Sequence, residues 1–293
     1  MLKYVHNQFK NMGQLIDGKA IAKKIRTSIA QEVKKLKKKN IKPKLGVILV
    51  GKDKPSQTYV NKKQQAAETI GIGFVLKNFP STISKNKLIS EIKQLQKKEK
   101  LSGLIIQLPL PEKLYTSEVI NAVDPSIDVD CLTDTNIGKL VMHTNYIFPP
   151  TPFAVITILK ELNFNLVGKN ITIVGMGALV GKPLAIILSN AGASVTTCNS
   201  RTRDTKEKCL MADIIVTGVG KKDLLRANMV KTGAIVIDTG IVFENGKMYG
   251  DANQEEVLPK ANYFTPTPGG VGPITVALLL QNTVLCAKQN SKK

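Results

Sequence analysis

The sequence contains no tryptophan, only two histidines and only 5% aromatic residues. Its four cysteines, Cys131, Cys198, Cys209 and Cys286, are scattered and include no Cys-x-x-Cys pair. This spacing predicts neither a disulfide framework nor a zinc site, so we expect no metal centre. Unpaired cysteines fit a reducing compartment, and we therefore expect a cytoplasmic protein.

Long hydrophobic runs are also missing. The N-terminal stretch "MLKYVHNQFKNMGQLIDG" has no apolar core of signal-peptide length, and "VALLL" near the C-terminus is too short to span a bilayer. We therefore expect no contact with a membrane. Residues 1–11 have the character of an extension, because Met12 could equally well begin the chain.

Arginine is scarce beside the many lysines. The formal net charge is +20, yet only four of the 42 basic residues are arginine. Lysine runs such as "KKLKKKNIKPK" contain no aromatic residues of the kind that stack on bases, so we expect no nucleic-acid partner. Two interpretations of the lysines remain: solvated helix faces, or a positive field that concentrates a polyanionic substrate or cofactor.

The chain does contain alternating apolar runs and helical patterns, and its 293 residues suffice for two α/β domains. In the first half, helical spacing at about 14–39 precedes the buried strand "KLGVILVG", a helix ended by Gly71, and a lysine-rich helix at about 85–100. In the second half, five β-branched runs predict a doubly wound parallel sheet: "NITIVGMG", "ASVTTCNS", "ADIIVTGVG", "GAIVIDTG" and "NYFTPTPGG".

A domain boundary is expected near residue 150, in the proline-bearing stretch "NYIFPPTPF". The sequence thus predicts an α/β protein of two domains: residues 1–150, and a Rossmann-type doubly wound nucleotide-binding domain over 151–273. The closing segment 274–293, helical to about 288, is expected to pack back on the first domain.

A glycine loop points to a dinucleotide. In "ITIVGMGALVGKP", with glycines at 175, 177 and 181, Gly175 permits a tight turn, Gly177 lets the backbone approach a pyrophosphate, and the helix that the motif opens offers N–H groups to the anion. Its spacing is one residue longer than the commonest fingerprint, and an ordinary strand–helix turn is the alternative.

The end of the next strand favours NADP over NAD. An NAD enzyme usually places an acid there, whereas this chain reads "CNSRTRD", with Asn199, Ser200, Arg201 and Arg203. Hydroxyl and guanidinium groups suit a 2′-phosphate. The alternative is that these residues form only a polar loop.

Tyr59 and Lys63 lie four residues apart, on one face of the predicted helix, and Ser56 stands at its start, where N-capping is its simplest role. Short-chain dehydrogenases carry a tyrosine–lysine pair at the same spacing, but after their nucleotide loop. Here the pair precedes the loop by more than a hundred residues. This order argues against that class.

Two further segments carry polar residues that packing does not require. "IIQLPLP" puts Gln107 at the carboxyl end of a strand, where open α/β sheets bind ligands, and "SIDVDCLT" sets Asp128 and Asp130 in a loop.

In "TPTPGGVGPITVA", Pro268, Gly269 and Gly270 lead into a helix with Pro273 near its first turn. Close backbone approach to a flat ligand would explain this loop; a rigid connection between domains is the alternative.

Together these motifs resemble the bifunctional methylenetetrahydrofolate dehydrogenase/cyclohydrolase family from about residue 13 onward. The matching motifs are "SQTYVNKK", "QLPLP", "DVD", "VGKPLA", "GAIVID" and "PGGVGPIT". The resemblance implies oxidation of 5,10-methylene-tetrahydrofolate with NADP and hydrolysis of the methenyl product to 10-formyl-tetrahydrofolate. It also implies a folate-binding catalytic domain and a homodimer.

The resemblance assigns roles residue by residue. Lys63 matches the catalytic lysine, Tyr59 the aromatic residue that stacks on the substrate, and Gln107 the residue that tunes the lysine. Asp130 matches the carboxylate that holds the pterin ring, and Ser56 a serine that supports the site. Gly175, Met176, Gly177, Ser200 and Ile241 fall where the family contacts NADP, and Arg201 joins these expected cofactor contacts because of its place in "CNSRTRD".

The chain departs from the family at the cofactor loop. The family usually has arginine where this chain has Met176, and histidine where Asn199 precedes Ser200. NADP is therefore expected, with NAD as an alternative. A degenerate binding protein, or an enzyme that retains one of the two activities, is the alternative function.

Overall fold

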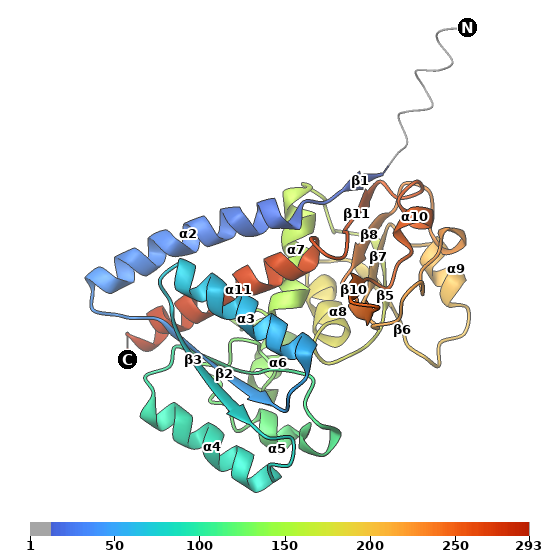
Figure 1. Ribbon diagram of the computed structural model, residues 1–293. Helices are drawn as coiled ribbons and strands as arrows, with labels where there is room; N and C mark the ends of the chain where they lie inside the picture. The colour runs from blue at the N-terminus through green and yellow to red at the C-terminus, as the bar shows by residue number, and fades with distance from the viewer. Residues whose placement is uncertain (1–12, 293) are drawn as a thin grey trace, which may run out of the picture. The chain divides into compact units, whose positions relative to one another are not determined.

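The computed structural model describes residues 13–292, which form two compact units (Figure 1). One unit consists of the chain up to Ile21 together with Thr151–Thr275. The other consists of Ala22–Pro150 together with the chain from Val276 onward. We refer to them as the first and second units. The extension expected for residues 1–11 lies outside the described residues.

The second unit is built on a parallel sheet in the order β3-β2-β4. Its main elements are α2 (Gly18–Lys38, whose start is grouped with the first unit), β2 (Lys44–Val50), α3 (Lys54–Thr69), β3 (Gly73–Phe79), α4 (Lys85–Lys98), β4 (Gly103–Ile106), α5 (Ser117–Ile120), α6 (Asp134–Val141) and α11 (Val271–Asn290, from Val276 in this unit).

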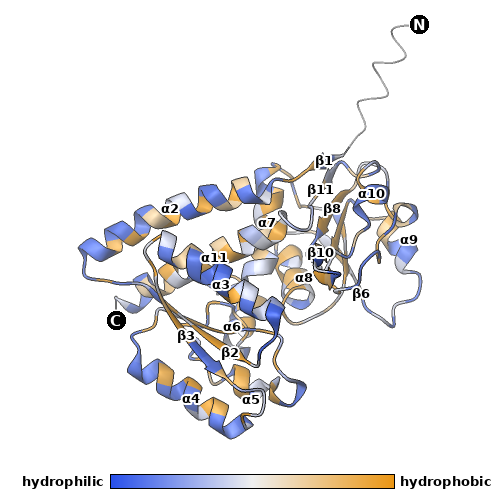
Figure 2. Ribbon diagram, viewed as in Figure 1, coloured by the Kyte–Doolittle hydropathy of each residue, from blue (hydrophilic) through white to orange (hydrophobic). Residues whose placement is uncertain are grey.

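The central strand β2 is buried on both faces, as its unbroken apolar run predicts (Figure 2). Leu45, Val47 and Leu49 pack into one hydrophobic cluster with α2, α3 and α11. Ile48 and Val50 pack into a second cluster with α4 and α5. Because successive side chains of a strand point to opposite faces, this alternation shows that helices cover both faces of the sheet.

Helix α11 matches the closing helix expected over about 274–288 but is longer at both ends. It spans Val271–Asn290 and is long and apolar enough to cross a membrane by length and composition, although 61% of its apolar window is buried. Leu279, Leu280 and Val284 belong to the core cluster of the second unit. The apolar length of α11 is therefore explained by core packing.

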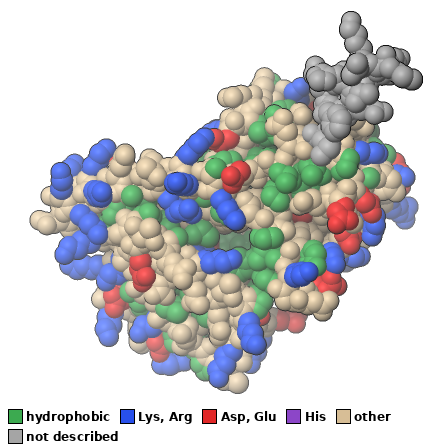
Figure 3. All heavy atoms as spheres, turned by 45° about the horizontal axis from the view of Figure 1, so that its top comes forward, with side chains coloured by type: hydrophobic (Ala, Val, Ile, Leu, Met, Phe, Trp, Pro, Cys, Tyr) green, Lys and Arg blue, Asp and Glu red, His purple; other side chains and the backbone are tan. Residues whose placement is uncertain are grey.

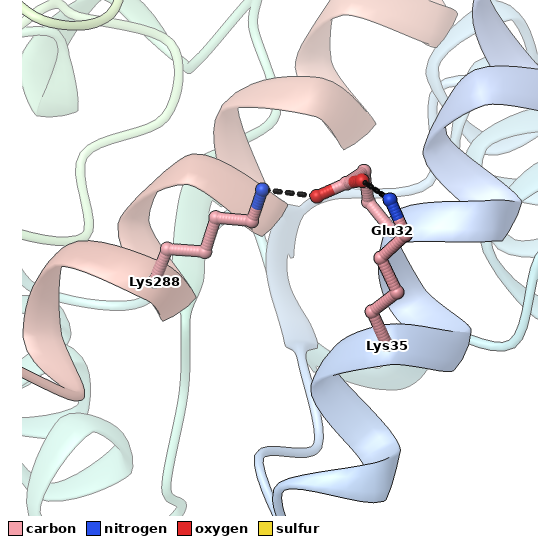
Figure 4. A network of polar contacts seen from close by, with 3 residues as sticks. All are labelled: Glu32, Lys35 and Lys288. Carbon is pink, nitrogen blue, oxygen red and sulfur yellow. Dashed lines mark hydrogen bonds and ion pairs between the residues drawn. The ribbon is translucent and has the colours of Figure 1, made fainter.

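A polar network also ties α11 to α2 (Figure 4). The carboxylate of Glu32 accepts hydrogen bonds from Lys288 of α11 and, at 2.8 Å, from Lys35 of α2. These two ammonium groups lower the pKa of Glu32 to about 2. On the face seen in Figure 3, Lys and Arg side chains lie singly or in small groups, which fits solvated helix faces.

The first unit contains a six-stranded parallel sheet in the order β1-β11-β8-β7-β5-β6. Its strands are β1 (Gln14–Leu15), β5 (Asn170–Val174), β6 (Ser194–Cys198), β7 (Ile214–Thr217), β8 (Ile235–Asp238) and β11 (Tyr263–Phe264), and a hairpin pairs β9 (Val242–Glu244) with β10 (Lys247–Tyr249). Its helices are α7 (Pro150–Glu161), α8 (Gly181–Asn190), α9 (Thr205–Leu210) and α10 (Gln254–Val257).

The five strands predicted for the second half of the chain are confirmed, and so is the doubly wound topology. Strand β6 lies on one side of β5 and β7 on the other, so the chain reverses its direction of winding between β5 and β7. Ligands of open α/β sheets bind outside the carboxyl ends of the strands at such a switch point. We call the edge where β5, β6, β7 and β8 end the carboxyl edge.

The first described residues do not form the start of the helix that was expected over about 14–39. Residues 14–15 form strand β1, which pairs in parallel with β11, and the helix begins only at Gly18. The Asp17 carboxylate accepts a hydrogen bond from Ala20 N at 2.9 Å, which fixes this start. Residues 14–15 therefore extend the sheet of the first unit.

Candidate active site

Helix α3 places Tyr59 and Lys63 one turn apart on a single face, as their spacing predicts. The helix is capped by Asp53, whose backbone is extended and whose carboxylate accepts a hydrogen bond from Ser56 N at 2.8 Å. The prediction that Ser56 itself serves as the N-cap is therefore wrong. Ser56 lies in the first turn with only 3% of its surface exposed.

The amine of Lys63 meets the amide of Gln107, which directly follows β4. Lys63 Nζ donates a hydrogen bond to Gln107 Oε1 at 2.8 Å. Gln107 Nε2 donates in turn to the Leu108 carbonyl oxygen at 2.7 Å. Because this second bond fixes which end of the amide faces the lysine, the Lys63 amine has a neutral acceptor as its partner.

Burial and one carboxylate set the protonation of this site. Burial lowers the pKa of Lys63, and the negative charge of Asp130 opposes that shift. Burial also raises the pKa of Asp130 to about 6; Lys63 counteracts this effect and Asp128 adds to it. Both side chains are half-buried. A lysine with a lowered pKa beside a carboxyl group with a raised pKa is an arrangement typical of sites that transfer protons.

Tyr59 is also half-buried, and burial raises the pKa of its phenol. A phenol with a raised pKa is a poorer proton donor, which favours a role in packing against a ligand over a role as the acid. Lys62 Nζ lies 5.7 Å from the centroid of the ring.

Asp128 has a different environment from Asp130, although only one residue separates them. Its carboxylate is 3% exposed and accepts hydrogen bonds from Leu132 N, from Thr133 N and Oγ1, and from Asn136 Nδ2, at 2.7–3.2 Å. These bonds anchor the loop between Asp128 and helix α6. Asp128 therefore holds the backbone that presents Asp130.

The glycine loop lies at the carboxyl edge of the first unit. Gly175 has φ +107°, and a Cβ there would lie 2.5 Å from the Gly218 carbonyl oxygen. A Cβ on Gly181 would lie 1.9 Å from the Gly175 carbonyl oxygen, whereas no atom lies within 4 Å of the position for Gly177. The first and third glycines thus allow close packing, and the second leaves the loop open to a ligand.

The other predicted cofactor contacts lie along the same edge. Gly175 N donates to the Cys198 carbonyl oxygen at 2.9 Å, which brings the loop beside the turn that carries Ser200 and Arg201. Met176 is half-buried, whereas Ser200 and Arg201 are exposed. Ile241, after β8, is 39% exposed.

One residue at this edge was not predicted. Val219, in the loop after β7, is 48% exposed although it is apolar. The signal was present in the sequence, because "TGVG" ends a buried strand in the same way as the glycine loop does.

The loop with Pro268, Gly269 and Gly270 belongs to the first unit, whereas Lys63, Gln107 and Asp130 belong to the second. The Thr267–Pro268 peptide bond is cis, and Gly269 has φ +112°. A Cβ on Gly18 would lie 1.8 Å from the Gly270 carbonyl oxygen. Position 18 therefore has to be glycine, because the loop packs directly against its backbone. This close approach is made by the protein's own chain and not by a ligand.

These features define a two-domain α/β protein with a lysine–amide–carboxylate site on one unit and a Rossmann-type nucleotide-binding edge on the other. Family models agree with this class. Residues 16–130 match the catalytic domain of tetrahydrofolate dehydrogenase/cyclohydrolase, and residues 149–291 match its NAD(P)-binding domain. The chain belongs to the tetrahydrofolate dehydrogenase/cyclohydrolase family, so the resemblance and the expected fold class are confirmed.

Individual relatives cover nearly the whole chain. The bifunctional protein FolD of Aliarcobacter butzleri (strain RM4018) is 45% identical over 281 residues, 95% of this chain and 98% of that protein. The crystal structure of the bifunctional FolD dehydrogenase/cyclohydrolase from Campylobacter jejuni has a TM-score of 0.91 at 40% identity, covering 94% of this chain and 99% of that one.

The Trypanosoma brucei enzyme, crystallised with NADP cofactor and an inhibitor, has a TM-score of 0.92 at 34% identity and covers 96% of this chain and 99% of its own. This match extends the similarity to a relative whose structure contains the cofactor.

The hydrogen bonds of Asp128 generate a prediction about stability. Asp128→Ala leaves four donors of a buried loop without their acceptor, and we expect the free energy of unfolding to fall by about 2–4 kcal/mol. Urea unfolding measures this loss. Asp124→Ala is the matched control, because Asp124 is exposed and its carboxylate accepts one bond within its turn, from Ser126 N. Equal stability of Asp128→Ala and the parent would contradict the anchoring role.

Proposed function

We propose that this protein oxidises 5,10-methylene-tetrahydrofolate to the 5,10-methenyl form with NADP and hydrolyses the methenyl form to 10-formyl-tetrahydrofolate. Family membership over nearly the full chain supports both activities. The observation that carries the proposal for this chain is the 2.8 Å hydrogen bond from Lys63 to Gln107, at a lysine whose pKa is lowered by burial. A degenerate binding protein would not need this arrangement.

Lys63 is proposed to move the protons of the hydrolysis. Water adds its oxygen to the methenyl carbon and gives one proton to the neutral Lys63 amine. The bond from that carbon to N5 then breaks, and N5 takes the proton from Lys63. The carbinol hydroxyl releases its own proton to solvent, which leaves the formyl group on N10.

The remaining residues of the second unit position the substrate and the amine. Gln107 orients Lys63 without adding a charge that would raise its pKa. Asp130 is proposed to bind the pterin ring through hydrogen bonds, Tyr59 to stack on the substrate, and Ser56 to support the substrate site. For hydride transfer these residues contribute alignment more than proton transfer.

The carboxyl edge of the first unit fits a dinucleotide. Open space at Gly177 and the start of α8 suit a pyrophosphate, and Ser200 and Arg201 suit the 2′-phosphate of NADP. Bound NADP would supply the hydride acceptor. Pro268, Gly269 and Gly270 are proposed to contact the substrate.

We further propose that residues 151–273, which lie within the first unit, bind NADP, and that the second unit, which contains most of the catalytic domain expected over residues 1–150 and 274–293, binds the folate. A homodimer is proposed on the basis of the family resemblance, and a cytoplasmic location on the basis of the four scattered cysteines.

Lys63→Met tests the proton-transfer role. Methionine has a similar length but carries no proton, so we expect cyclohydrolase activity to be lost while the fold is kept. The measurement is the decay of methenyl-tetrahydrofolate, corrected for uncatalysed hydrolysis, on protein shown to be folded by circular dichroism. Lys54→Met, an exposed lysine at the start of the same helix, is the control. If a folded Lys63→Met enzyme hydrolysed the substrate at the rate of the parent, another group would have to carry the proton.

Met176→Arg tests the cofactor site. We expect the parent to prefer NADP to NAD, and the added guanidinium to strengthen NADP binding by about 1.5–3 kcal/mol through one charge-assisted contact with the 2′-phosphate. Steady-state constants for both cofactors, with Met176→Gln as an uncharged control, measure the effect. An arginine variant that gains no affinity for NADP, or gains as much for NAD, would show that Met176 does not lie beside the 2′-phosphate.

A further inference from the structure

Two buried carboxylates at the carboxyl edge have no part in the chemistry described above. Asp238 is the last residue of β8 and is 2% exposed; Asp251 follows β10 and is 0% exposed. Burying a charged group is costly unless its hydrogen bonds are satisfied. Their partners therefore indicate what these two residues hold in place.

Asp251 binds three successive backbone amides. Its Oδ2 accepts a hydrogen bond from Val219 N at 2.6 Å, and its Oδ1 accepts bonds from Gly220 N and Lys221 N, both at 2.8 Å. These three amides belong to the loop after β7. One side chain thus fixes the backbone of the whole loop at the carboxyl edge.

Asp238 joins this arrangement to the next strand. Its Oδ1 accepts hydrogen bonds from Thr217 Oγ1 at 2.9 Å and from Gly240 N at 2.8 Å. Its Oδ2 accepts a bond from Ala252 N, also at 2.8 Å. Asp238 therefore connects the end of β7, the turn after β8, and the residue that follows Asp251.

Two glycines let the carboxylates come this close to the backbone. A Cβ on Gly240, two residues after Asp238, would lie 2.1 Å from Cγ of Asp251. A Cβ on Gly250, just before Asp251, would lie 2.0 Å from Oδ2 of Asp238. A side chain at position 240 would therefore collide with the Asp251 carboxylate, and a side chain at position 250 would collide with the Asp238 carboxylate.

The backbone held in this way lies beside the glycine loop. A Cβ on Gly175 would lie 2.5 Å from the Gly218 carbonyl oxygen, so the loop after β7 packs directly on the proposed pyrophosphate site. The same two turns present Val219 and Ile241, which are 48% and 39% exposed. Exposed apolar side chains on two rigidly held turns can form a platform for a flat ligand.

We propose that Asp251, supported by Asp238, is a positioning residue for the dinucleotide: it holds the loop at 219–221 in its binding conformation before the cofactor arrives. This inference rests on the proposed NADP-dependent function. Its physical basis is preorganisation, because a loop that is already ordered does not lose conformational entropy when the ligand binds.

Asp251→Asn is the variant that tests this role. It keeps the size of the side chain but turns an NH₂ group toward amides that themselves donate, so the loop loses at least one hydrogen bond. We expect the dissociation constant for NADP, measured by isothermal titration calorimetry, to rise about tenfold or more. Cyclohydrolase activity, which needs no hydride transfer, should stay within about twofold of the parent.

Asp213→Asn is the matched control. Asp213 precedes β7 at the opposite end of the strand, where its carboxylate accepts a hydrogen bond from Asn170 N at 3.1 Å and pairs with Lys231 at 3.0 Å. This substitution also removes an aspartate that binds backbone in the same sheet, and it should leave NADP affinity unchanged. An equal loss of affinity in both variants would mean that general weakening of the sheet, not loop positioning, explains the effect.

A second measurement on the parent protein decides the case if Asp251→Asn does not fold. Amide hydrogen exchange at residues 219–221 should be slow in the absence of NADP, because Asp251 already binds these amides. Fast exchange that slows only on adding NADP would overturn the proposal, as would a folded Asp251→Asn protein with parental NADP affinity. Failure of the parent itself to bind NADP would instead refute the proposed function.

Discussion

The proposed chemistry depends on keeping one amine poorly solvated beside a neutral partner. If Lys63 were paired directly with a carboxylate, its charged form would be stabilised and its pKa would rise. In the structure its partner is Gln107 instead. The hydrogen bond from Gln107 Nε2 to the Leu108 carbonyl oxygen orients the side-chain amide so that its oxygen faces the amine. Asp130 still opposes the effect of burial on Lys63. The pKa of Lys63 therefore also depends on where the Asp130 carboxylate lies. Asp128 fixes that position, because its buried hydrogen bonds anchor the loop that carries Asp130.

Both units place their proposed ligand-binding residues where parallel strands end, but they fix them by different means. In the second unit, helix α3 and the residue after β4 bring side chains together. In the first unit, bare backbone at Gly175 and Gly177, and buried aspartates behind the neighbouring loops, shape the edge. Side-chain chemistry thus dominates in the second unit, whereas in the first unit backbone geometry shapes the edge and the side chains of Ser200 and Arg201 are proposed to add contacts to the 2′-phosphate. This division matches the needs of proton transfer on one side and of anion and ring binding on the other.

Much of this could be predicted because the signals are local. The glycine loop follows an apolar run, and Tyr59 and Lys63 share a helix face at a spacing of four. The hairpin of β9 and β10 was missed although its turn, Asn245-Gly246, is a strong hairpin signal. Other features could not be deduced from local pattern. Strand β1 exists only because β11 pairs with it. Asp251 resembles any loop aspartate until the fold brings residues 219–221, some thirty positions earlier, onto its carboxylate.

The most direct test of this account is a titration of Lys63 itself. Nuclear magnetic resonance of protein labelled at the lysine ε-carbon, with Lys63→Met to identify the signal, reports its pKa. We predict a pKa below the usual 10.5, and a further decrease in Asp130→Asn, because removing that negative charge disfavours the ammonium form. Hydrolysis of the methenyl substrate should then rise with pH as Lys63 loses its proton. A Lys63 whose pKa equals the ordinary lysine value of 10.5 and is unaffected by Asp130→Asn would contradict the account.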